Sequence, residues 1–597
     1  MNSYRTHTCS ELRAANIGKP TTLIGWVDSV RDHGGVIFID LRDRSGITQV
    51  VFHPEVNQDV AKASQQLRSE DMIQISGTVA ARLKTDTVDT TNADLPTGEI
   101  EVSADTLNVI NKADVLPFQL DRALSNEDLR LKYRFLDLRR PAMARNMQIR
   151  HRVTKATRDY LDEHGFLEIE TPILSKSTPE GARDFLVPSR LAPGKFYALP
   201  QAPQQYKQLL MVAGMERYFQ IARCFRDEDL RADRQPEFTQ VDIEASFITP
   251  EDIYNLVEGL LKRVYKESLG VDIPTPFPRM TWKEAMDQYG SDKPERRFGM
   301  KLTDVSSIFE NSGFKVFASA VSNGGVVKAI NAKGFGSASV GQIDALTKTA
   351  VEAGAKGLAY IKVREEDWRS PISKFLSDEE KQKLTEALDI ETGDLVLFAA
   401  GPWEPSCDIL GRVRLQCAEF MELLKDNKER DFLWVIEFPL VGWDEEEQRW
   451  VAIHHPFTRP VKEDEQKLLS GELSADLRAQ AYDVVLNGTE LGGGSIRIHE
   501  RDLQSAMFKA LGITEEQARE QFGHILDAFS FGAPPHGGLA LGLDLLVMMI
   551  CNAESIREVI AFPKNNRGAD LMSDSPAAAE DRQLRDIHIQ VKLPAKK

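Results

Sequence analysis

Charged side chains gather in the segment 223–244. A polar loop with Arg226, Asp227 and Glu228 lies between two stretches that have the pattern of strands. Planar guanidinium groups form paired hydrogen bonds with phosphate oxygens, so a hairpin of this kind suits a polyphosphate ligand. Taken alone, the same pattern also fits a solvated loop.

Two further segments carry weaker signals. The pattern of residues 165–174 is typical of a helix end that runs into an extended strand, with Pro172 tolerated at a sheet edge. Residues 536–546 begin with glycines that allow a backbone to approach a flat ligand closely, and a helix is expected after them. Neither segment is specific by itself.

The pattern of strands and helices indicates several domains. Five short strands, at 21–27, 36–41, 48–52, 72–79 and 100–109, predict a Greek-key barrel of the OB type, a common nucleic-acid-binding scaffold. Apolar residues at helical spacing follow at 143–164. If the polar hairpin and the glycine-rich segment line one site, the α+β stretch between them must bulge out as a separate body.

Bulk properties are those of a soluble globular chain. Its 597 residues predict roughly three to five domains. The net charge of −17 argues against a generally basic surface, although a local basic face can coexist with it. Five scattered cysteines without a CxxC pair suggest neither a zinc site nor disulfides, and no signal peptide or membrane span is apparent. We therefore expect a cytoplasmic protein.

In this order, the three segments resemble motifs 1, 2 and 3 of the class II aminoacyl-tRNA synthetases. Other stretches are similar to the bacterial branch of the aspartyl enzymes of that family: residues 183–188, 198–204, 226–240, 454–457 and 492–495. The resemblance covers nearly the whole chain. It implies an aspartate–tRNA ligase that activates L-aspartate with ATP and transfers it to the 3′-terminal adenosine of tRNA(Asp). It also implies a homodimer with the segment around Pro172 at the interface.

The resemblance implies an α+β multidomain fold: an OB-fold barrel, an antiparallel catalytic sheet flanked by helices, and an inserted α+β domain. The expected boundaries are an anticodon-binding domain at 1–112, a hinge at 113–141, catalytic parts at 142–296 and 426–563, an inserted domain of the GAD type at 297–425, and a C-terminal extension at 564–597.

Site residues are carried over from the family by position. Catalysis is expected to rest on Arg226, Glu228 and Asp242, with Arg226 contacting both the aspartate carboxylate and the α-phosphate. The residues expected to bind aspartate are Glu180, Gln204, Lys207, Arg226, Asp242, His454, His455 and Arg497. Those expected to bind ATP are Arg226, Asp227, Glu228, Gln235, Glu490, Gly542, Leu543, Asp544 and Leu545.

The charged groups of aspartate are expected to bind residues of opposite charge. Lys207 and Arg497 are expected to hold the side-chain carboxylate of aspartate, and Glu180 and Asp242 its ammonium group. Carboxylates beside ATP imply Mg²⁺, which prefers oxygen ligands, and the expected metal ligands are Asp483 and Glu490. Ordinary surface acids would show the same spacing, and the two histidines could be packing residues.

In the barrel, the residues expected to contact the anticodon are Arg31, His33, Phe38, Gln49 and Glu101. Unpaired loop bases can stack on an aromatic ring and expose their hydrogen-bonding edges. Phe38 could instead be a core aromatic residue.

One position departs from the family. Motif 3 ends in Gly-Leu-Asp-Arg in the family, whereas here Leu545 follows Gly542-Leu543-Asp544. Loss of a charge-assisted contact to phosphate costs about 1.5–3 kcal/mol. The chain could be a weak ATP binder, Arg234 could compensate in part, or the chain could be a tRNA-binding paralog without full activity.

The sequence also bears on specificity. His33-Gly34-Gly35 resembles the branch whose members charge both tRNA(Asp) and tRNA(Asn). An asparaginyl or lysyl enzyme would share the barrel and the three motifs. The cationic pair Lys207 and Arg497 favours a carboxylate ligand over an amide. Retention of Arg226, Glu228, Asp483 and Glu490 argues against a paralog that only binds RNA.

Overall fold

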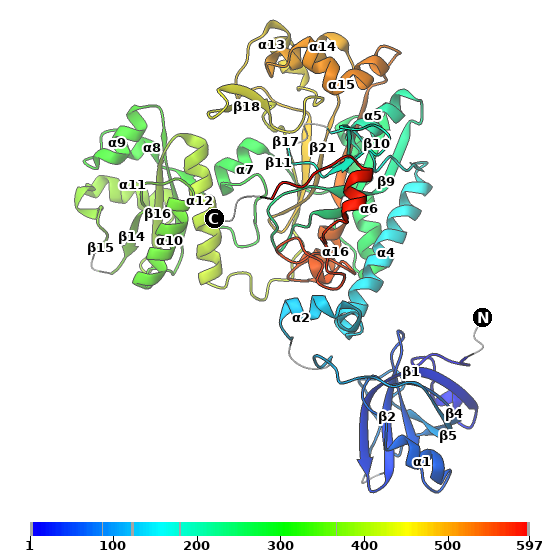
Figure 1. Cartoon of the computed structure of the whole chain (residues 1–597). Helices are drawn as coiled ribbons and strands as arrows, with labels where there is room; N and C mark the ends of the chain where they lie inside the picture. Colours follow the sequence, from blue (N-terminus) through cyan, green and yellow to red (C-terminus); the bar gives the residue numbers. More distant parts are fainter. Residues whose placement is uncertain (1–3, 86–87, 121–123, 178–180, 366, 594–597) are drawn as a thin grey trace. The chain divides into compact units, whose positions relative to one another are not determined.

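The computed structural model describes residues 4–85, 88–120, 124–177, 181–365 and 367–593 (Figure 1). The chain divides into two compact units, Met1–Ala144 and Arg145–Lys597. Among the described residues, no helix is both long and apolar enough to cross a bilayer.

The first unit is built around a closed five-stranded barrel of order β1-β2-β3-β5-β4, as the strand pattern predicts. Its inward-facing residues alternate with outward-facing ones along each strand. The unit contains β1 (Pro20–His33), β2 (Val36–Arg42), β3 (Ile47–Phe52), β4 (Met72–Ala81), β5 (Ile100–Asn111), the 3₁₀ turn η1 (Ala14–Asn16) and the helices α1 (Gln58–Ser64), α2 (Glu127–Lys132) and α3 (Arg134–Asp137).

The first strand is longer than its apolar pattern predicts. β1 continues to His33 and stays paired with β2 up to Val36, across a β-bulge between Val27 and Ser29. Gly34 and Gly35 close this hairpin with positive φ angles of 66° and 93°. The pattern ends early because the extended part of β1 is mostly exposed and carries polar residues.

The second unit is centred on an eight-stranded sheet of order β11-β17-β20-β21-β22-β10-β9-β6. The six strands from β17 to β9 are antiparallel, and the edge strands β11 and β6 pair in parallel with their neighbours. The strands are β6 (Leu167–Glu168), β9 (Arg217–Phe225), β10 (Glu237–Ser246), β11 (Arg279–Thr281), β17 (Phe432–Ile436), β20 (Ala481–Leu486), β21 (Thr489–Ile496) and β22 (His536–Gly542).

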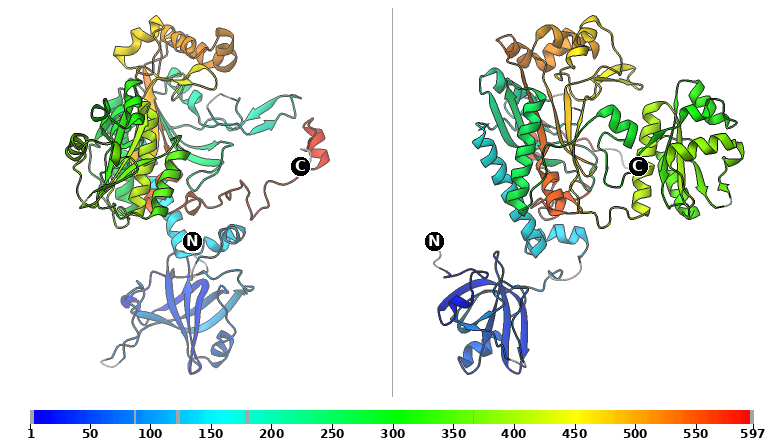
Figure 2. Two further views of the ribbon diagram at one scale, coloured as in Figure 1. Left: turned by 90° about the vertical axis from the view of Figure 1, so that its left-hand side faces the viewer. Right: turned by 180° about the vertical axis from the view of Figure 1, so that it is seen from behind.

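Long helices cover one face of this sheet. α4 and α6 lie side by side along it (Figures 1 and 2), and their apolar residues share one core with β10, β20 and β22. The helices of this region are α4 (Pro141–Glu163), α5 (Gln204–Val212), α6 (Pro250–Leu269), α7 (Trp282–Tyr289), α13 (Glu465–Ser470), α14 (Arg501–Ala510), α15 (Glu515–Phe529) and α16 (Leu543–Cys551). The expected fold class is therefore confirmed.

Short elements surround the sheet. They are the hairpins β7 (Leu186–Pro188) with β8 (Phe196–Ala198) and β18 (Val441–Asp444) with β19 (Arg449–Ala452), the 3₁₀ turns η3 (Lys462–Asp464) and η4 (Ile556–Glu558), and α17 (Asp581–Asp586) near the C-terminus. The expected extended strand around Pro172 is limited to the two residues of β6.

A separate five-stranded sheet of order β12-β13-β16-β14-β15 lies between the two halves of the main sheet in sequence. It contains β12 (Thr303–Asp304), β13 (Val326–Ala332), β14 (Ala359–Val363), β15 (Trp368–Arg369), β16 (Leu395–Gly401), α8 (Ser306–Phe309), α9 (Lys315–Ser322), α10 (Val340–Glu352), η2 (Ser373–Phe375), α11 (Asp378–Leu388) and α12 (Trp403–Phe420). It occupies the range of the expected inserted domain, whose exact boundaries stay a prediction.

The inserted sheet is joined to the main body by close packing of α12 on the end of α7. A Cβ atom added at Gly411 would lie 2.2 Å from the carbonyl oxygen of Gly290, which ends α7 with a positive φ. The buried Arg414 donates to the carbonyl oxygens of Glu295 (2.6 Å) and Met300 (2.7 Å). The backbones of α7 and α12 can approach this closely only because Gly290 and Gly411 lack a side chain.

We expect Gly411→Ala to lower the midpoint of thermal unfolding, because overpacking costs about 1–3 kcal/mol. Gly341→Ala in α10 is the matched control, since its added Cβ would have only Ser339 Oγ near it, at 4.0 Å. Differential scanning calorimetry of both variants checks this. An unchanged midpoint for Gly411→Ala would show that the contact is not tight.

Candidate active site

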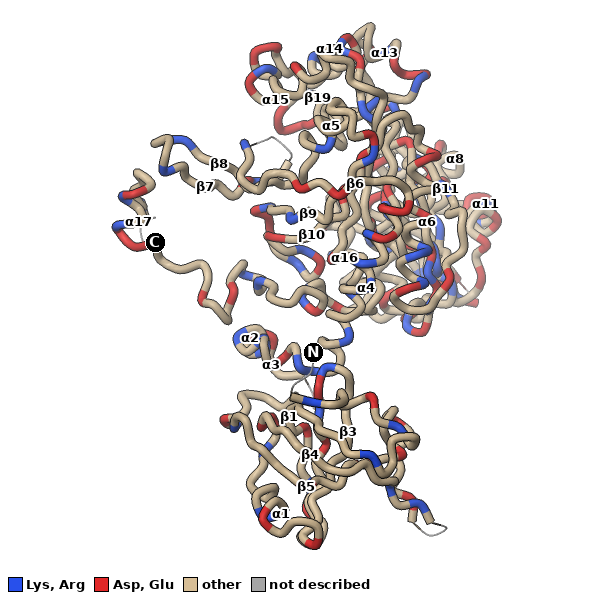
Figure 3. The backbone as a smooth tube through the Cα atoms, turned by 90° about the vertical axis from the view of Figure 1, so that its right-hand side faces the viewer, with Lys and Arg blue, Asp and Glu red and all other residues tan. Residues whose placement is uncertain are grey.

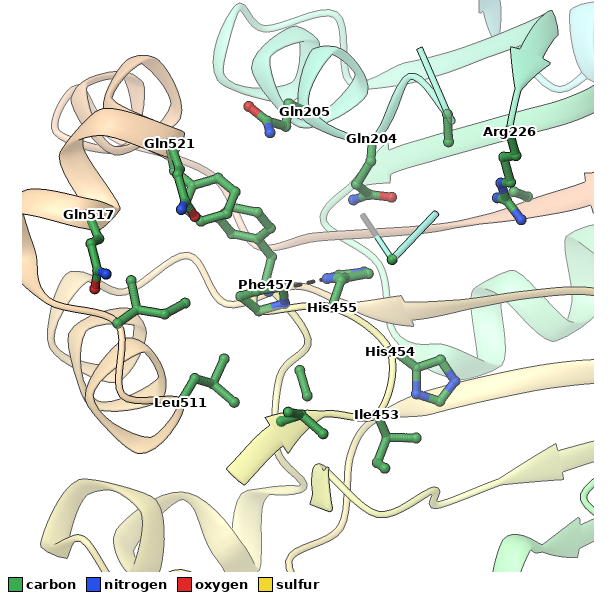
Figure 4. A pocket seen from close by; sticks show the side chains of 18 of the residues that line it. Gln204, Gln205, Arg226, Ile453, His454, His455, Phe457, Leu511, Gln517 and Gln521 are labelled. Atoms are coloured by element: carbon green, nitrogen blue, oxygen red, sulfur yellow. Dashed lines mark hydrogen bonds between the residues drawn. The ribbon is translucent and has the colours of Figure 1, made fainter. Parts of the chain in front are cut away.

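A cavity of about 890 Å³ opens between α5, the loop after β9, the hairpin β18–β19 and α15. Five residues that the sequence predicts to bind aspartate line it: Gln204, Arg226, Asp242, His454 and His455. Figure 4 shows Gln204, His455 and Arg226 from three different elements facing the same space. The structure thus brings together residues that lie as much as about 250 positions apart in the sequence.

Four buried charged groups lie beside the cavity. The Arg497 guanidinium donates to both carboxylate oxygens of Glu244, at 2.9 and 3.1 Å. The Lys207 ammonium lies 3.1 Å from Asp242 Oδ1 and 3.5 Å from Glu244 Oε2. Each of the four residues is at most 1% exposed, so the two cations and two anions balance one another away from water.

The two carboxylates of this network differ electrostatically. Burial raises the pKa of Asp242 even though the Lys207 ammonium opposes the shift. Burial acts on Glu244 in the same direction, but Arg497 and Lys207 together reverse it and leave the pKa of Glu244 lowered. Glu244 is therefore the more strongly stabilised anion of the network, and Asp242 can bind a further cation.

Four buried polar atoms of residues that line the cavity have no hydrogen-bond partner among the described residues: Gln205 Oε1, Arg226 Nε, Asp242 Oδ2 and His454 Nδ1. A buried polar atom without a partner costs free energy, so these atoms indicate a ligand. The cationic Arg226 suits an anionic group and the free oxygen of Asp242 suits a cationic one. The pair fits the carboxylate and ammonium groups of an amino acid.

The two histidines are uncharged at neutral pH. Burial, and then the nearby Arg497, lowers the pKa of His454 to about 4. The pKa of His455 is lowered well below its usual value by burial and by the same arginine, whose Nη1 lies 2.5 Å from His455 Nε2. Both side chains can thus border an anionic ligand as neutral hydrogen-bonding groups.

The loop between β9 and β10 carries alternating acidic and basic residues (Figure 3). The Arg226 guanidinium lies 5.1 Å from the centre of the Phe238 ring. Arg234 donates to Glu228 at 3.0 Å, and Asp227 pairs through its backbone with Arg183. Burial raises the pKa of Glu490, and the nearby Arg226 and Arg234 oppose this rise, so the charges of this loop and of β21 act on one another.

Three residues expected to bind ATP face the protein interior instead. The side-chain amide of the buried Gln235 donates to the carbonyl oxygen of Lys564 at 3.0 Å and accepts from Lys564 N at 2.8 Å. Asp544 accepts from Thr239 N (2.6 Å) and pairs with Arg150 (2.5 Å), and Leu543 belongs to the apolar core. As arranged here, these side chains position the loop and α16 rather than face a ligand.

Leu545 differs from its neighbours. It is half-buried at the start of α16, and its Cβ lies 3.6 Å from the Cβ that a substitution would add at Gly542. It therefore occupies the side of α16 on which Gly542 lies, where the family has its arginine.

Asp483 and Glu490 lie close together on β20 and β21. Burial, and then Glu490, raises the pKa of Asp483 well above its usual range, and burial also raises the pKa of Glu490. A bound divalent cation would offset this repulsion, so the pair fits a magnesium site with oxygen ligands. Among the described residues, no group of three or more His, Cys, Asp or Glu side chains is placed to hold a metal ion.

The chain is similar in sequence to two protein families and to many known proteins. The family described as "tRNA synthetases class II (D, K and N)" matches residues 126–566, and "OB-fold nucleic acid binding domain" matches residues 21–110. The chain belongs to the class II tRNA synthetases. An "Aspartate--tRNA(Asp/Asn) ligase" of Opitutus terrae is 55% identical over 99% of this chain and 100% of that protein.

Other relatives agree with this family. A protein of the same name from Bacillus subtilis is 54% identical over 99% of each chain, and an "Aspartate--tRNA ligase" of Geobacillus kaustophilus is also 54% identical over 99% of each chain. The asparaginyl-tRNA synthetase of Pyrococcus horikoshii complexed with asparaginyl-adenylate has the same fold, with a TM-score of 0.58 at 20% identity over 93% of this chain and 97% of that one.

The barrel of this synthetase presents the expected anticodon residues on one outer face. Arg31 pairs with Asp40 at 3.0 Å, and Gln49 donates to Glu101 at 2.9 Å. Phe38 is half-buried and meets the His33 ring edge-on, with 5.5 Å between ring centres. The described apolar core of the barrel does not include Phe38, so its ring has a face available for stacking.

Sequence reasoning missed one central residue of this site, and another residue that it predicted is not described by the structure. Glu244 was not among the expected site residues, although it is the direct partner of both Lys207 and Arg497. Its position two residues after Asp242 on β10 was the only available signal, because strand residues i and i+2 share a face. Glu180 lies outside the described residues.

L-Aspartate is the ligand that the sequence predicts for this network, and Glu244→Gln should weaken its binding. The substitution removes the carboxylate that holds Lys207 and Arg497 in position, and breaking a buried pair costs about 3–5 kcal/mol. We expect the Kd of L-aspartate, measured by calorimetric titration, to rise at least about ten-fold. Glu258→Gln is the matched control, because the buried Glu258 accepts a hydrogen bond from Trp434 Nε1 at 3.0 Å and lies outside the network. An unchanged Kd for Glu244→Gln would contradict the assignment.

Proposed function

We propose that this synthetase is an aspartate–tRNA ligase whose cationic pair Lys207 and Arg497 selects the side-chain carboxylate of L-aspartate. The observation that carries the proposal is the buried network of Lys207, Asp242, Glu244 and Arg497 beside the unpartnered Nε of Arg226. Hydrogen bonds from these two cations are stronger to a carboxylate than to a neutral amide, which disfavours an asparaginyl enzyme. Asp242 Oδ2 then serves the ammonium group.

In the first step, an α-carboxylate oxygen of aspartate forms a bond to the α-phosphorus of ATP while the bond to the bridging oxygen of pyrophosphate breaks. Arg226 borders both the cavity and the charged loop, so its guanidinium stabilises the negative charge that is redistributed at the α-phosphate. Glu228 and Arg234 hold the loop in position on the nucleotide side. No covalent bond to the protein is needed, because alignment of the reacting groups accelerates the step.

In the second step, a ribose hydroxyl of the 3′-terminal adenosine forms an ester bond to the aspartyl carbonyl carbon. The carbon–oxygen bond to the phosphate of AMP breaks, AMP leaves as an anion, and the hydroxyl proton is released. The neutral His454 and His455 border the amino acid during both steps without adding charge.

Magnesium and the wider assembly belong to the same proposal. Asp483 and Glu490 would hold Mg²⁺, which neutralises phosphate charge when bound. A homodimer is supported by exposed apolar residues in the segment after α4, since Leu167, Ile173 and Leu174 are 52%, 41% and 53% exposed. We place the enzyme in the cytoplasm.

Leu545 makes the ATP site weaker without removing the activity. The paralog hypothesis is not favoured, because full-length relatives at 51–55% identity are aspartate–tRNA ligases by name. Arg226 and Arg234 remain near Glu490, where the phosphates would lie. In the family, the motif 3 arginine is expected to contribute to the phosphate contacts. We propose that Arg226 and Arg234 make these contacts here.

Aspartate-dependent exchange of labelled pyrophosphate into ATP tests the activity and the role of Leu545 together. We expect exchange in the wild-type enzyme and a KM for ATP about ten-fold lower in Leu545→Arg, since a charge-assisted phosphate contact is worth about 1.5–3 kcal/mol. Leu545→Met controls for loss of leucine. Equal KM values would show that Arg234 compensates fully, and absence of exchange in all three proteins would refute the ligase assignment.

We further propose that the enzyme charges tRNA(Asn) as well as tRNA(Asp). The support is His33 at the tip of the β1–β2 hairpin and relatives named as acting on both tRNAs. Transcripts of both tRNAs should accept labelled aspartate, and a tRNA(Lys) transcript should not. Charging of tRNA(Asp) alone would contradict this specificity while leaving the ligase activity intact.

A further inference from the structure

The segment that follows α7, residues 291–297, lies against the turn between β20 and β21. A Cβ atom added at Gly488 in that turn would lie 2.9 Å from the Cβ atom of Glu295, so the two stretches of chain are in close contact. Glu490 on β21 is two residues after Gly488, and Lys293 is two residues before Glu295. The contact therefore brings this segment to the strands that carry the candidate magnesium ligands.

Polar contacts hold the backbone of this segment in place. The buried Arg414 on α12 donates to the carbonyl oxygen of Glu295 at 2.6 Å. The carboxylate of Glu295 is also buried and accepts from Arg297 Nε at 2.9 Å. Arg296 donates to Asp431, the residue before β17, at 2.8 Å. The segment is thus held by α12 on the side of the inserted sheet and by the main sheet on the other.

Lys293 differs from the other cations of this segment. Arg296 and Arg297 are half-buried and paired with Asp431 and Glu295. Lys293 is exposed, and its side chain forms no ion pair in the part of the chain that the structure describes. An ammonium group on a flexible stem, attached to a fixed backbone and not committed to a carboxylate, is suited to an anionic ligand such as a phosphate.

The charge of Lys293 acts on the candidate magnesium site. Burial raises the pKa of Glu490, and Lys293 opposes this rise more strongly than Arg226 or Arg234 does. Burial and then Glu490 raise the pKa of Asp483, and Lys293 again opposes the rise. In its effect on Glu490, Lys293 thus exceeds the two arginines of the loop between β9 and β10, although it comes from a different part of the chain.

We propose that Lys293 is a further cation of the ATP site and binds the β- and γ-phosphates, which leave as pyrophosphate. The proposal rests on the proposed ligase function, in which Asp483 and Glu490 would hold Mg²⁺. Because such a metal ion bridges β- and γ-phosphate oxygens, a cation beside these two carboxylates borders the same phosphates. Lys293 then supplies positive charge on the nucleotide side, where Leu545 supplies none.

A role in charge balance alone makes a different prediction. If Lys293 only offset the negative charge of Asp292, Asp483 and Glu490, its removal would strengthen the binding of Mg²⁺ and would not weaken the binding of ATP. If Lys293 binds the leaving phosphates, its removal weakens ATP binding and spares AMP, which lacks these phosphates.

Calorimetric titration with ATP and with AMP, each with Mg²⁺ and without aspartate, distinguishes the two roles. We expect Lys293→Met to raise the Kd of ATP about ten-fold, as loss of a charge-assisted hydrogen bond predicts, and to leave the Kd of AMP unchanged. Lys293→Arg keeps the charge and should retain most of the affinity for ATP. Lys283→Met is the matched control, because it removes the same charge from an exposed position on α7 and should bind ATP as the wild type does.

Pyrophosphate exchange gives a second measurement on the same variants. Lys293→Met should raise the KM values of ATP and of pyrophosphate about ten-fold and leave the KM of aspartate unchanged. An unchanged aspartate KM also shows that the variant is folded, since the aspartate network depends on the assembled sheet.

Three results would overturn the proposal: an unchanged or lower Kd of ATP in Lys293→Met, equal losses of affinity for ATP and AMP, or a loss in Lys283→Met as large as that in Lys293→Met. Absence of exchange in the wild-type enzyme would instead refute the ligase function itself, so the two failures are distinguishable.

Discussion

The pairing of Arg497 with Glu244 is the interaction on which the site depends. A bidentate guanidinium–carboxylate pair fixes both side chains in orientation as well as in charge, and here both residues are at most 1% exposed. It links the region after β21 to β10, and Lys207 extends the link to α5. Burying four charges is costly unless they balance. The network is therefore stable only when all three elements are in place, and the specificity site is a consequence of the sheet's assembly.

Two glycines of the main sheet leave room for carboxylates. A Cβ atom at Gly538 of motif 3 would lie 2.1 Å from Glu244 Oε2, and one at Gly493 of β21 would lie 2.0 Å from Asp483 Oδ1. Each glycine leaves room on the sheet surface for a carboxylate of the neighbouring strand. From the sequence, the glycines of motif 3 predict close approach of a backbone to something flat. The structure shows that the group approached is in large part a protein side chain.

The sequence predicted the elements better than it predicted the pairings. The barrel strands, the hairpin of β9 and β10 and the helix that follows the glycines of motif 3 were predicted from local patterns, because alternation and turn residues are local signals. The Arg497–Glu244 pair joins residues 253 positions apart, and Gln235 bonds to a residue 329 positions away. No local pattern contains such contacts. The extended half of β1 was missed for another reason: its exposed, polar residues give no apolar alternation.

Motif 3 also shows how a fold can lose a ligand contact without losing its structure. Asp544 pairs with Arg150 on α4 and accepts a hydrogen bond from the backbone of Thr239 on β10, so it fixes the position of α16 on the main sheet. Leu545, the next residue, lies outside the apolar core, on the side of Gly542. The structural role and the ligand role of the motif thus reside in adjacent residues that point in different directions. Leucine in place of the family's arginine leaves the contacts of Asp544 unchanged, so the weaker ATP site that we propose is compatible with an intact catalytic sheet.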